Sequence, residues 1–217
     1  MKIMVIGATR GIGLVLTKMA LESGHEVTAL LRDPGKLSLS HPKLRIATGD
    51  IRNQASVEYA LAGQDAVCVC IGVPPSRKPM DVFSQGACNV LAAMQKAPNV
   101  KLISVTGIGA GDSRGHGGFL YDKLIQPLLL KTMFEDKDRE EAIIKASTVD
   151  WMIVRPGMLT NGAHTGQYRV LTELSGVTAG KISRADVADF ILRQLEQPAV
   201  SSSSRQSYFR QTPLLTY

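Results

Sequence analysis

Short apolar runs alternate with segments of helical periodicity along most of the chain. The runs predict strands buried on both faces at residues 2–6, 26–31, 43–48, 66–71, 101–106 and 149–154. Apolar residues three and four positions apart predict helices from residue 12 to a stop at Gly24, over 54–62, along 83–94 and over 135–147. This alternation predicts an α/β fold: a single Rossmann-type doubly wound domain over residues 1–217, with a mostly parallel central sheet.

The C-terminal part of the chain has weaker patterns. Ser183-x-x-Asp186 resembles a capping box, which predicts a helix whose inner face includes Val187 and Leu195. A short strand is expected at 168–171, a flexible connection at 201–204 and a final strand at 206–210. Trp151 is expected in the core.

Three glycines follow the first predicted strand and open the first predicted helix. Gly7, Gly11 and Gly13 form the pattern G-x-x-x-G-x-G. The first glycine permits a tight turn, the second allows backbone to approach a pyrophosphate, and the third allows the helix to pack closely on the strand. The helix N-terminus favours anions, so this βαβ unit predicts a dinucleotide site.

Arginines stand at both places where a 2′-phosphate would lie. Arg32 ends the second strand 19 residues after Gly13, close to the position that discriminates between cofactors, and Arg10 lies inside the loop. Arginine favours the 2′-phosphate of NADP, whereas an acidic residue would favour NAD. We therefore predict NADPH, with Asp33 as the contrary sign.

Further cofactor contacts are expected at the ends of the later strands. Asp50 follows the third strand, where it either meets the adenine edge or caps the helix at 54–62. Gly72 ends the fourth strand, where a glycine suits close packing against a cofactor.

Charge and cysteine content narrow the function classes. The net charge is +6, but the 25 basic residues are scattered without interleaved aromatics, so we expect no nucleic-acid partner. The three cysteines include one C-x-C pair but no C-x-x-C and no neighbouring histidine pair, so we expect no metal site. Neither a signal peptide nor a membrane span is indicated at the start of the chain, which leads to the expectation of a cytoplasmic protein.

The catalytic residues of ordinary short-chain dehydrogenases are incomplete. Thr106 ends the fifth strand and is followed by Gly107 rather than serine. The nearby Tyr121 has Ile125 where Tyr-x-x-x-Lys requires lysine. Thr106, Tyr121 and His116 are therefore only weak catalytic candidates.

Two segments are expected on the substrate side, at residues 107–134 and 157–182. Residues 107–118 are glycine-rich and predict a mobile cover over the nicotinamide. Residues 119–134 are apolar but too short to span a membrane. They either cover the substrate cleft, supply a subunit contact or, as we expect, pack against the main sheet.

Several motifs resemble the atypical short-chain dehydrogenase/reductase group, which includes NmrA-like proteins and the flavin reductase/biliverdin reductase B family. They include Gly-Ala-Thr at 7–9, Leu-Arg-Asp at 31–33, Gly-Gln-Asp-Ala-Val at 63–67 and Thr-Gly-x-Tyr at 165–168. The resemblance covers nearly the whole chain. It implies cofactor contacts at Gly7, Thr9, Arg10, Gly11, Ile12, Gly13, Arg32, Asp50, Ile51, Ile71, Gly72, Val73, Thr106, Gly107, Pro156, Gly157 and Met158.

The resemblance also implies an activity. It favours an NADPH-dependent reductase that reduces FMN, FAD or a similar planar acceptor, because flavin reduction needs alignment more than a dedicated acid. Gly107 and Met158 replace a serine and a histidine of the biliverdin reductase B family, which disfavours biliverdin. The alternative is an NADP(H)-sensing regulatory protein of NmrA type without turnover. A sugar-nucleotide epimerase is disfavoured by the missing dyad, and a monomer or weak homodimer is expected.

Overall fold

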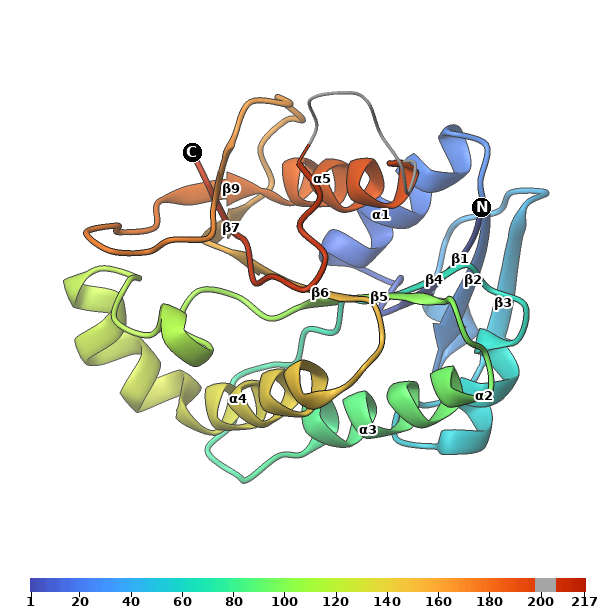
Figure 1. The fold of residues 1–217 in the computed structure, drawn as a ribbon, viewed down its shortest axis with the longest axis horizontal. Helices are drawn as coiled ribbons and strands as arrows, with labels where there is room; N and C mark the ends of the chain where they lie inside the picture. Colours follow the sequence, from blue (N-terminus) through green and yellow to red (C-terminus); the bar gives the residue numbers. More distant parts are fainter. Residues whose placement is uncertain (198–205) are drawn as a thin grey trace.

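One sheet runs through the middle of the molecule, and helices cover both of its faces (Figure 1). The computed structural model describes residues 1–197 and 206–217. The strands of the sheet are β1 (Lys2–Ile6), β2 (Glu26–Leu31), β3 (Leu44–Thr48), β4 (Ala66–Val69), β5 (Lys101–Val105), β6 (Trp151–Pro156), β8 (Arg169–Leu171) and β10 (Leu214–Thr216). The helices are α1 (Gly11–Glu22), α2 (Gln54–Leu61), α3 (Val82–Gln95), α4 (Lys131–Ala146) and α5 (Arg184–Glu196), with 3-10 turns η1 (Pro34–Lys36) and η2 (Gly111–Ser113).

The strand order confirms the predicted fold class. It is β3-β2-β1-β4-β5-β6-β10-β8, and all neighbouring pairs are parallel except β8 with β10. The chain moves outward from β1 in one direction and from β4 in the other. The gap between the carboxyl ends of β1 and β4 is therefore a topological switch point, where ligands bind in open α/β sheets. Strands β7 (Met158–Thr160) and β9 (Lys181–Ser183) form a separate parallel pair.

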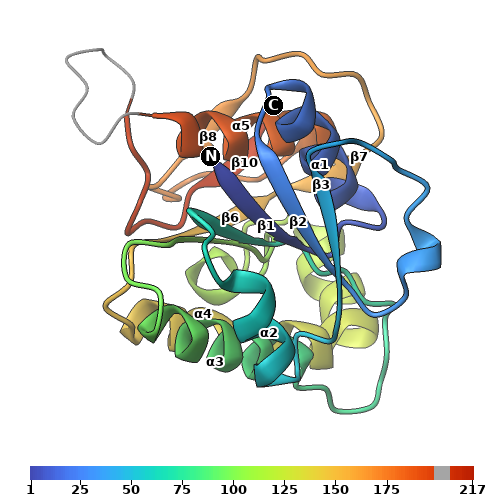
Figure 2. The same ribbon diagram turned by 90° about the vertical axis from the view of Figure 1, so that its right-hand side faces the viewer.

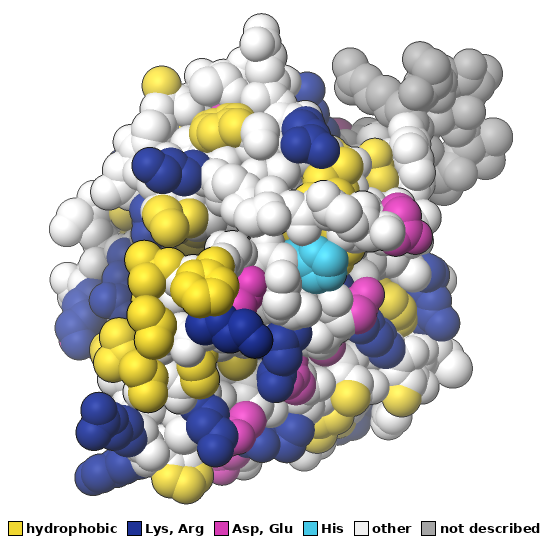
Figure 3. All heavy atoms as spheres, turned by 90° about the vertical axis from the view of Figure 1, so that its left-hand side faces the viewer, with side chains coloured by type: hydrophobic (Ala, Val, Ile, Leu, Met, Phe, Trp, Pro, Cys, Tyr) yellow, Lys and Arg dark blue, Asp and Glu magenta, His cyan; other side chains and the backbone are white. Residues whose placement is uncertain are grey.

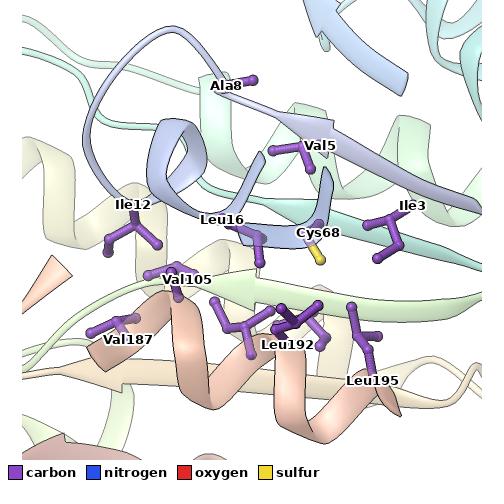
Figure 4. Packing of buried hydrophobic residues seen from close by; sticks show 14 of the residues in the cluster. Ile3, Val5, Ala8, Ile12, Leu16, Cys68, Val105, Val187, Leu192 and Leu195 are labelled. Carbon is purple, nitrogen blue, oxygen red and sulfur yellow. The ribbon is translucent and has the colours of Figure 1, made fainter. Parts of the chain in front are cut away.

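Both faces of the central strands are buried, as their continuous apolar runs predict. Ile3 and Val5 face the layer of α1 and α5, whereas Met4 and Ile6 face the layer of α2, α3 and α4. Figures 2 and 4 show these two layers and the packing of the first one. Trp151 is buried in the second layer, as expected.

The first six strands lie where the sequence predicts them, with ends shifted by at most two residues. The predicted final strand at 206–210 is wrong. Arg210 adopts a left-handed conformation (φ 65°), and its N–H donates to the Trp151 carbonyl, so the chain turns there. The strand that joins the sheet is β10, beyond Pro213. The connection expected at 201–204 lies outside the described residues.

The apolar segment 119–134 is not buried against the sheet along most of its length, contrary to expectation. Most of it forms η3 (Tyr121–Leu130), a π-helical segment that contains Pro127 and continues into α4, which begins four residues before its predicted start. The exposed apolar side chains of this segment are Phe119, Leu120, Leu124, Leu128 and Leu129. Figure 3 faces this end of the molecule and shows an apolar patch bordered by basic side chains.

The start of α5 confirms the predicted cap. The Ser183 hydroxyl accepts a hydrogen bond from the Asp186 N–H at 3.0 Å. None of the helices in the described part of the chain has both the length and the apolar character needed to cross a bilayer.

Candidate functional site

A cleft of about 1500 Å³ opens at the carboxyl ends of the sheet strands. All of the predicted cofactor contacts except Gly13 line it. They come from the ends of β1, β2, β3, β4, β5 and β6, which the topology brings to one edge of the sheet. Six basic and two acidic side chains line this cleft among the described residues, so it is suited to an anionic ligand.

The three glycines of the loop have different roles. A Cβ on Gly7 (φ +94°) would lie 2.5 Å from the Cys70 carbonyl oxygen, and one on Gly13 would lie 2.3 Å from the Gly7 carbonyl oxygen. Both positions therefore require glycine for packing, and Gly13 lies behind the cleft rather than in it. Around Gly11 the space is open, since the nearest atom to its Cβ position is Arg184 Nε at 3.9 Å.

The N-terminus of α1 has no side-chain cap. Arg10 occupies the N-cap position in extended conformation, its side chain does not bond the first turn, and that turn contains no acidic residue. The first N–H groups of α1 and the positive end of its dipole therefore face the open space at Gly11. These features fit the pyrophosphate of a dinucleotide.

Three cations follow the ends of β1 and β2. Arg10, Arg32 and Lys36 all line the cleft, and Arg10 donates to the Gly72 carbonyl at 3.0 Å. Asp33 is already bonded, because its carboxylate accepts from the Gly35 N–H at 3.1 Å and lies 3.3 Å from Lys36 Nζ. The one acidic residue that argued for NAD is thus held within its own turn.

Asp50 is not the cap of α2, so that alternative is wrong. Asn53 caps the helix by accepting from the Ser56 N–H at 2.9 Å. Asp50 instead accepts from the Arg52 N–H and guanidinium, and these hydrogen bonds hold the pKa of its carboxyl below the usual range. It lines the cleft, where contact with the adenine stays a prediction.

Thr106 lines the opposite end of the cleft, and its hydroxyl hydrogen has a partner. Thr106 Oγ1 donates to Glu141 Oε1 at 2.8 Å, and Arg155 Nε donates to the same oxygen at 3.0 Å. Burial would raise the pKa of the Glu141 carboxyl, but the Arg155 guanidinium outweighs it and the pKa is lowered. With Glu141 ionised, Thr106 can offer only its lone pairs to a ligand.

The other two catalytic candidates lie in different places. Tyr121 lines the cleft and its hydroxyl donates to the Ile108 carbonyl at 3.2 Å, while burial raises the pKa of Tyr121 to about 12. His116 is not among the lining residues. Its Nδ1 bonds the Val177 carbonyl at 2.8 Å, which indicates a structural role.

Lys137 is a lining residue that the sequence reasoning missed. It is buried on α4, where Nζ donates to the Val105 carbonyl at 3.3 Å and lies 4.4 Å from the centre of the Phe83 ring. Burial lowers the pKa of its ammonium. Met133 lies one turn earlier and also lines the cleft. No local sequence pattern marks Lys137, because its place in the cleft comes from the packing of α4 against the sheet.

Apolar side chains dominate the part of the cleft beyond Thr106. They come from the two segments expected on the substrate side and from the start of α4. They are Ile108, Tyr121, Met133, Phe134, Met158, Leu159 and Ala179. This region is suited to an apolar part of a ligand.

Comparisons with known proteins agree with this geometry. A model of the family described as NAD(P)H-binding matches residues 7–198. An uncharacterized chloroplastic protein of Arabidopsis thaliana is 29% identical over 204 residues, covering 90% of this chain and 72% of its own. The uncharacterized sugar epimerase YhfK of Bacillus subtilis is 26% identical, covering 91% and 89%.

Solved structures share the fold over the whole chain. ChuY, an anaerobillin reductase from Escherichia coli O157:H7, has a TM-score of 0.79 at 23% identity and covers 100% of this chain and 97% of its own. A short-chain dehydrogenase/reductase from Veillonella parvula in complex with NADP has a TM-score of 0.77 at 17% identity and covers 100% and 94%. At these identities the likeness establishes the fold.

Proposed function

The chain belongs to the NAD(P)H-binding family, and from that premise we propose an NADPH-dependent reductase of the atypical short-chain dehydrogenase/reductase type, acting on planar acceptors such as FMN or FAD. The observation that carries the proposal is one continuous cleft with a cationic end at the glycine loop and an apolar end beyond Thr106. A dinucleotide and an acceptor bound there would lie in contact.

The preference for NADPH rests on the residues around the end of β2. Arg32, Lys36 and Arg10 offer three cations, and the carboxylate of Asp33 is bonded to Gly35 and Lys36. An ionised 2′-phosphate would gain charge-assisted hydrogen bonds there, whereas a ribose 2′-hydroxyl would compete with Gly35 and Lys36 for the Asp33 carboxylate.

The residues at the Thr106 end of the cleft orient ligands. Bound NADPH supplies the hydride. Thr106 accepts a hydrogen bond from an N–H or O–H of a ligand, because its own proton is donated to Glu141. Lys137 Nζ uses one N–H on Val105 and keeps others for hydroxyls or carbonyls in the cleft. The apolar walls exclude water from the face where an acceptor would stack.

Cofactor choice is tested by fluorescence titration of NADPH and NADH into wild-type protein and into the double variant Arg10→Ala/Arg32→Ala. The variant should bind NADPH about 10- to 100-fold more weakly, because charge-assisted hydrogen bonds to the 2′-phosphate are lost, with little change for NADH. Arg45→Ala is the matched control, since Arg45 is exposed and stacks on the Tyr59 ring away from the cleft. An equal loss for both cofactors would refute the phosphate assignment.

Turnover is tested with the same protein and a panel of FMN, FAD, quinones and biliverdin at fixed NADPH. Oxidation of NADPH above background with a planar acceptor supports the reductase. Tight binding of NADPH without turnover on any of them would contradict it and favour the NADP(H)-sensing alternative of NmrA type.

A further inference from the structure

A cation faces the phosphate loop from the opposite wall of the cleft. Arg184 is the first residue of α5, and both Arg184 and Gly11 line the cleft. Arg184 Nε is the nearest atom to the Cβ position of Gly11, at 3.9 Å. Helices α1 and α5 pack side by side on the same face of the sheet (Figure 4), which fixes the two helix N-termini close together.

The local surroundings of Arg184 do not explain its charge. It lies at the positive end of the α5 dipole, where a cation is disfavoured. Its guanidinium donates to the neutral Asn161 Oδ1 at 2.8 Å, and no carboxylate of a described residue lies within ion-pair distance. The acidic residue of the same turn, Asp186, is bonded elsewhere, to the Thr165 and Gly166 N–H groups and to the Tyr217 hydroxyl.

The loop itself lacks a cation for the pyrophosphate. Its only basic residue is Arg10, whose guanidinium already donates to the Gly72 carbonyl after β4. The N–H groups of α1 provide partial charges on one side of the open space. A half-buried guanidinium on the other side provides the full charge.

We infer that Arg184 binds the cofactor pyrophosphate from α5, opposite the Gly7–Gly13 loop. This inference rests on the proposed binding of NADPH. Asn161 is the positioning residue, because it holds the guanidinium over the loop before a ligand arrives. Asn161 directly follows β7, so Arg184 also ties the phosphate site to the segment expected on the substrate side.

The test separates the two phosphate sites with two ligands. NADPH carries both the pyrophosphate and the 2′-phosphate, whereas adenosine 2′-monophosphate carries only the latter. Dissociation constants for both are measured by calorimetry for wild-type protein, Arg184→Met, Arg184→Lys and Arg32→Met. Arg184→Met should weaken NADPH about 10- to 100-fold and leave adenosine 2′-monophosphate within about twofold of wild type. Arg32→Met should weaken both ligands, and Arg184→Lys should recover part of the NADPH affinity.

Other results overturn the inference. Unchanged NADPH affinity in Arg184→Met would show that the guanidinium does not bind the pyrophosphate. Equal weakening of both ligands, with lower thermal stability, would assign Arg184 a structural role. If the wild-type protein binds both ligands and only Arg184→Met behaves differently from expectation, the role of Arg184 is refuted but the proposed function is not. A wild-type protein that binds neither overturns both.

Discussion

At the scale of single residues, Glu140 shows how burial controls a charge beside the cleft. Its Oε1 accepts from Ser104 Oγ at 2.6 Å, its Oε2 has no hydrogen-bond partner among the described residues, and burial raises the pKa of the carboxyl to about 7. The folded protein therefore holds this proton more tightly than the unfolded chain. Stability from this group is present below pH 4.5 and is lost as the pH rises toward and through 7.

Glu140→Gln should remove the loss of stability at rising pH, because glutamine does not ionise. Its amide oxygen can still accept the hydrogen bond from Ser104. We expect the variant to gain stability relative to wild type between pH 5 and 8, by up to about 3 kcal/mol. Urea unfolding of both proteins at several pH values measures the difference. A difference that stays constant over this range would show that Glu140 does not titrate as described.

The candidate site was only partly predictable residue by residue. The glycines, Arg10 and Arg32 stand in a local pattern whose spacing carries the chemistry. Lys137 and Arg184 have no such pattern, because their meaning comes from packing of α4 and α5 against strands far away in the sequence. The hydrogen bonding of Thr106 depends on Glu141 and Arg155, and no sequence pattern indicates that these three residues are in contact.

At the scale of elements, the junction of β1 and α1 depends on glycine at position 13. Gly13→Ala would place a Cβ 2.3 Å from the Gly7 carbonyl oxygen, so the backbone must shift. We expect a loss of about 2 kcal/mol or more in the free energy of unfolding, together with loss of NADPH binding. Gly72→Ala is the control for folding, since no atom lies within 4 Å of its Cβ position. Equal stability of Gly13→Ala and wild type would contradict the close packing of helix on strand.

The strands buried on both faces could be predicted, because a short continuous apolar run is typical of such a strand. The failures are at places where local pattern and tertiary context differ. The left-handed turn at Arg210 replaces the expected strand, and Leu124, Leu128 and Leu129 of η3 are exposed although the composition of the segment suggested burial. Composition indicates that a segment is apolar but not which surface covers it.

At the scale of the whole molecule, the fold brings residues from both ends of the chain to one cleft. The glycine loop and Arg32 come from the first 32 residues, whereas Pro156, Met158 and Arg184 come from the last third. The strand order 3-2-1-4-5-6 was predictable as a class, and it determines where these residues meet. The identity of the acceptor is not encoded in that order.

The central claim is that NADPH passes hydride directly to an acceptor held against it in this cleft. The most direct test is single-turnover oxidation of NADPH carrying deuterium at one or the other of its two C4 positions, with the acceptor that the panel identifies. Because a cofactor fixed at the Gly7–Gly13 loop presents one face to the apolar end, we predict slower oxidation for one deuterated form only. Equal rates for both forms and for unlabelled NADPH would contradict direct, oriented transfer as the step that limits this reaction.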